Sequence, residues 1–237
     1  MYIIWEDRKL VGIGFNIEER FGMKDIIIIG AGGFGRETVQ LIDDINSNIL
    51  QWNLLGFVDD KKEIQGKEIN GYQVLGGIDF LNYYEEDVYI VSAIANCRTK
   101  KNIIEKLNNK NIRFANLIHP SAVVARDLKL GFDIIIQSNC VLTTNIRIGN
   151  HVGISPQCGL GHDCYIGDYC TLFWNVNIGG QVVVEEGCLL GTKTTIIQER
   201  RVGSWSIVGS NANIIRDIQD NCTAVGNPAE VIKFHNT

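Results

Sequence analysis

Aliphatic residues recur at every sixth position through the C-terminal half of the chain. A six-residue period with one aliphatic residue per hexad is typical of a coil with flat faces, in which three hexads make one triangular turn and the aliphatic side chains stack inside it. The seventeen hexads therefore predict a left-handed parallel β-helix of between five and six coils. Their first residues are Ile118, Val124, Leu130, Ile136, Leu142, Ile148, Ile154, Leu160, Ile166, Leu172, Ile178, Val184, Leu190, Ile196, Val202, Val208 and Ile214.

Two further positions of the hexad have a fixed character. The second position is often glycine, and we expect a sharp corner with positive φ there. The fifth position should also point inward and is small in most hexads. Leu128, Ile134, Ile146 and Arg200 break the fifth-position pattern, so we expect the outer coils and one late hexad to be less regular. The second-position glycines are Gly131, Gly149, Gly161, Gly167, Gly179, Gly191, Gly203 and Gly209.

Short aliphatic runs in the N-terminal half alternate with segments of helical pattern. This alternation predicts a small, Rossmann-like parallel α/β sheet whose ligand crevice lies at the carboxyl ends of its strands. The glycine turn Gly30–Gly35 and the pair Asp59-Asp60 both follow predicted strands, so we expect them to meet at that crevice. The predicted strands are Ile26–Ile29, Leu54–Val58, Val88–Ala93 and Ile112–Leu117, and the helices run from about Phe34 to Asn46 and around Cys97–Asn108.

These patterns divide the chain into an extension (1–22), a Rossmann-like domain (23–115), the β-helix (116–219) and a tail (220–237). The extension lacks the layout of a signal peptide, so we expect the protein to be cytoplasmic. Met23-Lys24-Asp25, directly before the first predicted strand, is a natural start, so we expect the extension to lie outside the fold. The apolar run Ile26–Ile29 is far too short for membrane insertion. A net charge of −5 argues against nucleic acid as the main partner, because phosphate binding needs a clustered basic surface.

The glycine turn has more than one interpretation. Gly30, Gly32 and Gly35 match the G-x-G-x-x-G pattern, and acidic residues follow the next strand, as in an NAD-binding site. The 93 residues from Met23 to Ala115 leave room for roughly four strands, against about six in a full dinucleotide fold. The estimated number of strands favours a glycine turn that holds one nucleotide. A turn with a purely structural role remains an alternative interpretation.

The cysteines raise the question of a metal site. Cys158, Cys164 and Cys170, with His162 among them, could be proposed as a metal cluster. However, five of the seven cysteines occupy the inward fifth position, where cysteine acts as a compact hydrophobic residue. We therefore expect packing cysteines and no metal.

Four histidines could serve as a general base. We expect His119, at the domain junction, and His235, in the tail, to be structural or solvated, and His151 lies in the turn region of a hexad. His162 follows a corner glycine and should project outward, next to a carboxylate, Asp163, that could orient its imidazole. From spacing alone, His162 is either a catalytic base or a solvated corner histidine.

Five segments together carry a family resemblance: Ile29–Glu37 (IGAGGFGRE), Gly56–Asp60 (GFVDD), Ile118–Ala122 (IHPSA), Gly161–Asp168 (GHDCYIGD) and Val225–Ala229 (VGNPA). In this order they resemble the bacterial sugar O-acyltransferases, hexapeptide-repeat acyltransferases typified by the sialic acid O-acetyltransferase and the bacillosamine-pathway N-acetyltransferase. The resemblance covers nearly everything from Met23 to Lys233. The segments around His162 and Pro228 are its more specific parts, and the glycine turn is the least specific.

The resemblance implies a homotrimer of β-helices with the co-substrate, acetyl-coenzyme A (acetyl-CoA), in the cleft between neighbouring subunits. It implies that His162 is the general base, that Asp163 supports it, and that the backbone N–H of Gly180 holds the thioester carbonyl. It also implies that the N-terminal domain binds the nucleotide of the sugar through Gly32, Phe34, Asp59 and Asp60.

Two departures from the bacillosamine enzyme are visible: its histidine nine residues after the base is Thr171 here, and the histidine of its glycine turn is Phe34. We expect acetyl-CoA-dependent N-acetylation of a nucleotide-linked amino sugar in surface-polysaccharide or glycan biosynthesis. O-acetylation of a sugar or sialic acid on the same fold is the alternative. A non-catalytic scaffold and an NAD-dependent enzyme are the rival interpretations from other classes.

Overall fold

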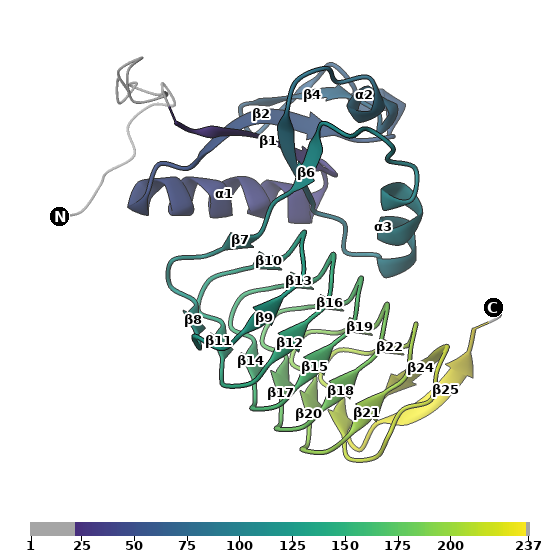
Figure 1. The fold of residues 1–237 in the computed structure, drawn as a ribbon. Coiled ribbons are helices and arrows are strands. Elements are labelled where there is room, and N and C mark those ends of the chain that lie inside the picture. The colour runs from purple at the N-terminus through teal and green to yellow at the C-terminus, as the bar shows by residue number, and fades with distance from the viewer. Residues whose placement is uncertain (1–21, 236–237) are drawn as a thin grey trace, which may run out of the picture.

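The computed structural model describes residues 22–235 and places an α/β domain on one side of a β-helix (Figure 1). The predicted extension, apart from Gly22, lies outside the described residues. Within the described part of the chain, no helix is long and apolar enough to span a bilayer. The predicted fold class, a small parallel sheet followed by a left-handed β-helix, is confirmed.

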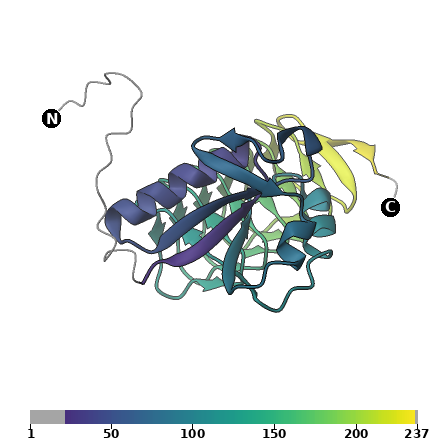
Figure 2. The same ribbon diagram turned by 90° about the horizontal axis from the view of Figure 1, so that it is seen from above.

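The N-terminal domain is built on one sheet with the strand order β3-β4-β2-β1-β5-β6. All neighbours in it are parallel except the pair β3 and β4. Seen from above, this sheet lies across the coils of the β-helix (Figure 2). The strands are β1 (Lys24–Ile29), β2 (Trp52–Val58), β3 (Glu68–Ile69), β4 (Tyr72–Gly76), β5 (Val88–Ser92) and β6 (Ile112–Phe114).

The count of four strands was wrong, because the hairpin β3–β4 adds two. Asn70 and Gly71 form its turn with φ angles of 49° and 84°. An Asn-Gly pair is the usual signal for a two-residue hairpin turn that needs positive φ at both positions. The aliphatic pattern missed the hairpin because β3 is two residues long and Val74 is the one fully buried side chain of β4.

Side chains on opposite faces of β1 enter two different cores, as strand alternation requires. Ile26 and Ile28 pack with α1 (Gly33–Asn48) and with Leu117 and Ile135 of the β-helix. The other face of the strand packs against α2 (Asp79–Asn82) and α3 (Cys97–Ile104). Helix α1 therefore lies between the sheet and the β-helix (Figure 1). A 3-10 helix, η2 (Lys62–Ile64), follows β2.

The β-helix has three faces of two-residue parallel strands. Successive coils pair in register 18 residues apart, as Ile136 does with Ile154 and Ile154 with Leu172. Face 1 comprises β7 (Leu117–Ile118), β10 (Ile135–Ile136), β13 (Gly153–Ile154), β16 (Thr171–Leu172), β19 (Leu189–Leu190) and β22 (Ile207–Val208). Face 2 comprises β8 (Val123–Val124), β11 (Val141–Leu142), β14 (Gly159–Leu160), β17 (Asn177–Ile178), β20 (Thr195–Ile196) and β23 (Asn213–Ile214). Face 3 comprises β9 (Lys129–Leu130), β12 (Arg147–Ile148), β15 (Tyr165–Ile166), β18 (Val183–Val184) and β21 (Arg201–Val202).

A C-terminal hairpin extends face 1 beyond the last coil. Strand β24 (Cys222–Val225) pairs in parallel with β22, and β25 (Glu230–Phe234) returns antiparallel to it. The aliphatic first positions from Ile136 to Ile214 are buried, as the period predicted.

The explanation given for the second-position glycines was wrong. Positive φ falls on the fourth position of the hexad, at values between 57° and 63° for every non-glycine residue there from Asp133 to Asn211. Where the second position is glycine, the next coil passes too close for a side chain: a Cβ on Gly161 would lie 2.7 Å from the backbone N of Gly180. The spacing between coils, and not the backbone conformation, therefore selects glycine.

The fifth-position cysteines are buried inside the prism, as expected. Each thiol donates to a backbone carbonyl of the next coil, as Cys164 does to the oxygen of Gly179 at 3.0 Å. Burial raises the pKa of the Cys164 thiol. Ile134 and Ile146 are buried at the same position, whereas Arg200 turns outward to Asp217 at 3.5 Å.

A buried polar network joins the two domains. The backbone N–H of Ser92, at the end of β5, donates to Asp133 Oδ1 at 2.7 Å, and the Ser92 hydroxyl bonds the other carboxylate oxygen. His151 Nδ1 lies 2.7 Å from the same Asp133 Oδ2. Lys100 of α3, also buried, donates to the carbonyl of His151 at 2.8 Å and to the hydroxyl of Thr171 at 3.2 Å.

Candidate active site

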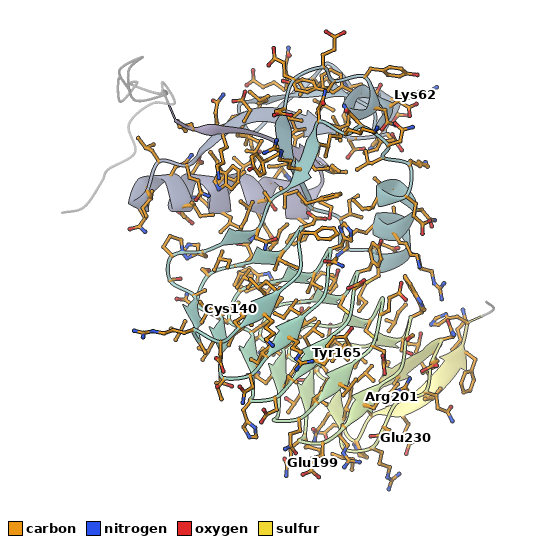
Figure 3. All side chains as sticks on the ribbon, in the orientation of Figure 1. Lys62, Cys140, Tyr165, Glu199, Arg201 and Glu230 are labelled. Atoms are coloured by element: carbon orange, nitrogen blue, oxygen red, sulfur yellow. The ribbon has the colours of Figure 1, made fainter. Side chains whose placement is uncertain are left out.

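The corner between faces 2 and 3 presents His162 to solvent, as the hexad position predicted. The turn joins β14 to β15, and the His162 side chain is 59% exposed. Its Nδ1 lies 2.7 Å from Oδ2 of Asp163, which adopts a left-handed φ of 60°. Tyr165, on β15 directly after this turn, points outward from face 3 (Figure 3).

Gly180 lies directly under the His162 ring, one coil further on. A Cβ at Gly180 would stand 2.5 Å from Nε2 and 2.6 Å from Cε1 of the imidazole, so any larger residue would displace the ring. The Gly180 N–H donates no hydrogen bond to any group within residues 22–235. The structure therefore brings together His162, Asp163 and an available backbone donor, the three elements that the resemblance implied.

The charge on Asp163 sets the tautomer of His162. Hydrogen bonds from His162 and, second, from Asn145 hold the pKa of Asp163 below its usual range, so the carboxylate is ionised at neutral pH. An ionised carboxylate only accepts hydrogen bonds, so a neutral His162 carries its proton on Nδ1. Its Nε2 is then the unprotonated nitrogen and can act as a base above Gly180.

A groove of about 480 Å³ runs along face 3 beside this pair. Lys129 and Arg147 occupy paired positions on β9 and β12 and give the groove a basic wall. Tyr165 continues the same column on β15. Asp127 and Asp163 line the same groove, so it carries two basic and two acidic side chains next to the His162 turn.

The four residues predicted to bind the nucleotide lie in one cavity of the N-terminal domain. It measures about 600 Å³ and is lined by Gly32, Phe34, Asp59 and Asp60 at the carboxyl ends of β1 and β2. The prediction missed Thr99, Asn102 and Lys106, which α3 and the following turn contribute to the opposite wall. A helix after the third predicted strand was the available signal, since that strand ends at the same crevice.

The glycines of the turn have different roles. Gly30 has a φ of 97°, and a Cβ on Gly35 would lie 1.9 Å from the Gly30 carbonyl oxygen, so both are required by the backbone. A Cβ on Gly32 or Gly33 would meet nothing within 4 Å. These two glycines leave the first turn of α1 open to the cavity, where its unpaired N–H groups favour an anion such as a phosphate.

Both predicted aspartates are held by backbone donors. The carboxylate of Asp59 accepts from the N–H of Ala31 and of Lys61, each at 2.9 Å. Asp60 Oδ1 accepts from the N–H of Ile78 at 2.8 Å, and its Oδ2 lies 4.0 Å from Lys106 Nζ. Asp59 therefore shapes the glycine turn, whereas Asp60 keeps one oxygen toward the cavity.

The two departures from the family pattern lie where the domains meet. The Phe34 ring packs on face 1, since a Cβ at Gly153 would lie 3.1 Å from it. Thr171 is buried and accepts the hydrogen bond from Lys100. Neither position lies on the His162 corner, so neither side chain reaches the base in its own chain.

The cavity and His162 lie on different sides of one chain. The N-terminal domain packs on face 1 through Leu117, Ile135 and Phe34. The His162 corner joins the other two faces, and Glu199, on the same corner, lies at the edge away from the N-terminal domain (Figure 3). The residues predicted to bind the nucleotide and the predicted base are therefore not brought together within a single chain.

Comparison with known proteins agrees with this architecture. Residues 25–107 match the family described as the PglD N-terminal domain. The chain is 32% identical over 123 residues to the GDP-perosamine N-acetyltransferase of Escherichia coli O157:H7, covering 52% of this chain and 55% of that protein. It is also 32% identical over 117 residues to the UDP-N-acetylbacillosamine N-acetyltransferase of Bacillus subtilis strain 168, covering 49% and 52%. The matches thus span about half the length of these curated relatives.

Solved structures match over a longer stretch. The acetyltransferase domain of PglB from Neisseria gonorrhoeae FA1090 superposes with a TM-score of 0.80 at 25% identity, covering 88% of this chain and 100% of that one. PerB from Caulobacter crescentus, solved with CoA and GDP-perosamine, has the same fold with a TM-score of 0.62 at 22% identity, covering 90% and 99%. The resemblance to hexapeptide-repeat sugar acyltransferases is confirmed, and its N-terminal part is the match of residues 25–107 to the PglD N-terminal domain.

Proposed function

We propose that this protein is an acetyl-CoA-dependent acetyltransferase that N-acetylates a nucleotide-linked amino sugar in surface-polysaccharide or glycan biosynthesis, in the cytoplasm. The observation that carries the proposal is the His162 imidazole, oriented by Asp163 and lying over Gly180 with Nε2 toward solvent. The names of the relatives support the substrate class: two are N-acetyltransferases of nucleotide-linked sugars, and the Neisseria domain was also solved with acetyl coenzyme A.

In the proposed reaction, His162 Nε2 accepts a proton from the sugar amine as the amine nitrogen attacks the thioester carbonyl carbon. The carbon–sulfur bond breaks, the acetyl group stays on nitrogen, and the thiolate of CoA leaves and is protonated. The Gly180 N–H, which has no partner within residues 22–235, stabilises the negative charge on the carbonyl oxygen. Asp163 stabilises the imidazolium that forms.

The proposed enzyme is a homotrimer, with acetyl-CoA between neighbouring β-helices. The support is geometric: the domain that holds the nucleotide cavity packs on face 1, whereas His162 lies on the corner between the other two faces, so a second chain is needed to bring the cavity and the base together. Exposed apolar side chains on face 2, Val123 and Val141 among them, suit contact with a second subunit.

Subunit mixing tests this arrangement. His162→Ala and Asp60→Ala chains, each inactive or impaired alone, are co-expressed and assayed together. If base and cavity come from different subunits, mixed trimers contain some intact sites and activity returns. No recovery, or a monomer of 26.4 kDa by light scattering, contradicts the shared site.

The activity itself is tested with a panel of nucleotide sugars that carry an amine or only hydroxyls. Thiol release from acetyl-CoA is recorded with each acceptor. The proposal requires release with an amino sugar. Release with a hydroxyl acceptor alone would mean O-acetylation at the same site, and no release with any acceptor would favour a scaffold. Stabilisation by nicotinamide cofactors in a thermal-shift screen would favour the NAD interpretation.

A further inference from the structure

A third side chain, Asn145, holds the His162–Asp163 pair from the neighbouring coil. Asn145 Nδ2 donates to Asp163 Oδ1 at 3.0 Å, while His162 Nδ1 lies 2.7 Å from Oδ2. Each carboxylate oxygen thus has its own donor. Two donors on opposite oxygens fix the plane of the carboxylate, and that plane decides which way the imidazole faces.

Asn145 is itself held in place by the coil before it. Asp127 Oδ2 accepts from the backbone N–H of Asn145 at 2.9 Å and from the hydroxyl of Thr144 at 2.6 Å. Asp127, Asn145 and Asp163 occupy equivalent turn positions on three successive coils, 18 residues apart. Asn145 and Asp163 share the same left-handed backbone, with φ angles of 58° and 60°, so their side chains leave the corner in parallel.

The amide between two carboxylates has a chemical consequence. Asn145 is neutral, and it donates two hydrogen bonds to carboxylates. Its side-chain amide donates to Asp163, and its backbone N–H donates to Asp127. An aspartate there would place three acidic groups in a row beside His162. The other charged groups in the adjoining groove are Lys129 and Arg147, and Cys164 and Tyr165 are its remaining titratable groups.

We propose that Asn145 is a positioning residue for the acyl transfer: its amide fixes Asp163 so that the carboxylate accepts the hydrogen bond from the Nδ1–H of His162 and Nε2 stays over Gly180. This inference rests on the proposed function. Asn145 does not touch the reacting atoms, and its effect reaches them through Asp163 alone.

Asn139 offers a matched control for a purely structural role. It occupies the same turn position on the neighbouring corner, is exposed, and has a φ of 57°. Its side chain makes no hydrogen bond to any group in the described range, 22–235. Glycine tolerates this backbone conformation, so Asn145→Gly and Asn139→Gly remove the side chain equally without adding strain.

The experiment compares Asn145→Gly, Asn145→Asp, Asn139→Gly and His162→Ala in the full-length protein. Thermal unfolding, kcat, both KM values and the pH dependence of kcat are measured for each. We expect Asn145→Gly to lower kcat about 10-fold or more, the equivalent of one lost hydrogen bond to a charged group, with both KM values unchanged. Asn139→Gly should match the wild type.

Asn145→Asp is the second arm, and it preserves the shape of the side chain if the glycine variant is unstable. Its added negative charge favours the imidazolium, so the acidic limb of the kcat profile should move to higher pH. A role in coil stacking alone would lower the melting temperature of Asn145→Gly and leave its kcat in place. If His162→Ala abolishes activity while Asn145→Gly keeps the wild-type kcat, the inference about Asn145 is overturned and the proposed function stands. If His162→Ala is fully active, the proposed function itself fails.

Discussion

Two corners of the same β-helix carry a histidine–aspartate pair, and the pairs differ in environment rather than in contact distance. His151 Nδ1 lies 2.7 Å from Asp133, with side chains 5% and 0% exposed. His162 Nδ1 lies 2.7 Å from Asp163, with side chains 59% and 43% exposed. A histidine hydrogen-bonded to a carboxylate is therefore not by itself evidence of catalysis. The role of each pair depends on what surrounds the imidazole ring and the carboxylate.

The His151 pair has protein groups on every side. Its ring stacks on Tyr169 and meets Phe114 and Phe132 edge-on, at centroid distances from 4.8 to 5.1 Å. Asp133 also binds the backbone and hydroxyl of Ser92, which joins the domains. The His162 pair instead has the bare backbone of Gly180 under Nε2 and solvent above it. The first arrangement supports docking of the domains, and the second leaves room for a substrate.

The largest expected effect tests the exposed pair. His162→Ala should lower kcat by about 10²–10⁴-fold, the usual contribution of a positioned general base, because the amine then loses its proton acceptor. The melting temperature should barely change, since the side chain is exposed. Steady-state thiol release and thermal unfolding measure the two quantities. Wild-type kcat at neutral pH in this variant would contradict the assignment.

The buried pair should show the reverse behaviour. Asp133→Gly leaves the donors of Ser92 and His151 buried and unpaired, so we expect a loss of about 3 kcal/mol or more in the free energy of unfolding. Glu199→Gly is the control, because Glu199 is exposed at the same turn position with the same φ of 60°. Denaturant titration of both variants provides the comparison, and equal stabilities would mean that the network contributes little.

Much of the fold was predictable because it repeats. An aliphatic residue such as Ile154 stacks on its equivalents in the neighbouring coils. The same requirement for an aliphatic residue therefore recurs in every hexad, and the repeat can be recognised in the sequence. The positive φ of the fourth position escaped prediction because residues as different as Asp163 and Trp205 occupy it. The β3–β4 hairpin escaped because it is short and has one fully buried side chain, Val74.

The site was predictable only where its residues are neighbours in sequence or match the family pattern. His162 and Asp163 are adjacent, so their pairing follows from the chain itself. Asn145 lies 18 residues away, and its contact depends on how coils stack. The 18-residue coil was the available signal, since it puts both residues in register. The contacts of Lys100 depend on how the domains dock, and no local pattern encodes that docking.

A smaller effect is expected on the inner side of the His162 corner. Cys164 follows Asp163 directly but points into the prism, where its thiol bonds the carbonyl of Gly179. Cys164→Leu should overpack the coil and cost about 1–3 kcal/mol, while the variant keeps its kcat at temperatures where it is folded. Cys164→Ala is the size control. Stoichiometric zinc, or loss of activity on treatment with a chelator, would show that this interpretation of the cysteines is wrong.

The smallest effect concerns the adjacent carboxylates of Asp59 and Asp60. Like the two histidine pairs, they differ in whether protein groups occupy all of their polar atoms. Both oxygens of Asp59 accept backbone hydrogen bonds, whereas Asp60 keeps Oδ2 without a hydrogen bond inside the described part of the chain. Asp60→Asn preserves the acceptor for Ile78 and replaces the other oxygen with a donor. If Oδ2 binds the nucleotide, the KM for the sugar should rise about 10-fold, the value of one hydrogen bond, and the KM for acetyl-CoA should stay the same.

Asp59→Asn supplies the contrast for that measurement. It disturbs the bond that holds Ala31 in the glycine turn, so we expect lower thermal stability together with a higher KM for the sugar. A specific role for Asp60 requires that its own variant change the KM without changing the melting temperature. Equal changes in both KM values for Asp60→Asn would instead point to a general disturbance of the domain, because the two substrates rest on different parts of the molecule.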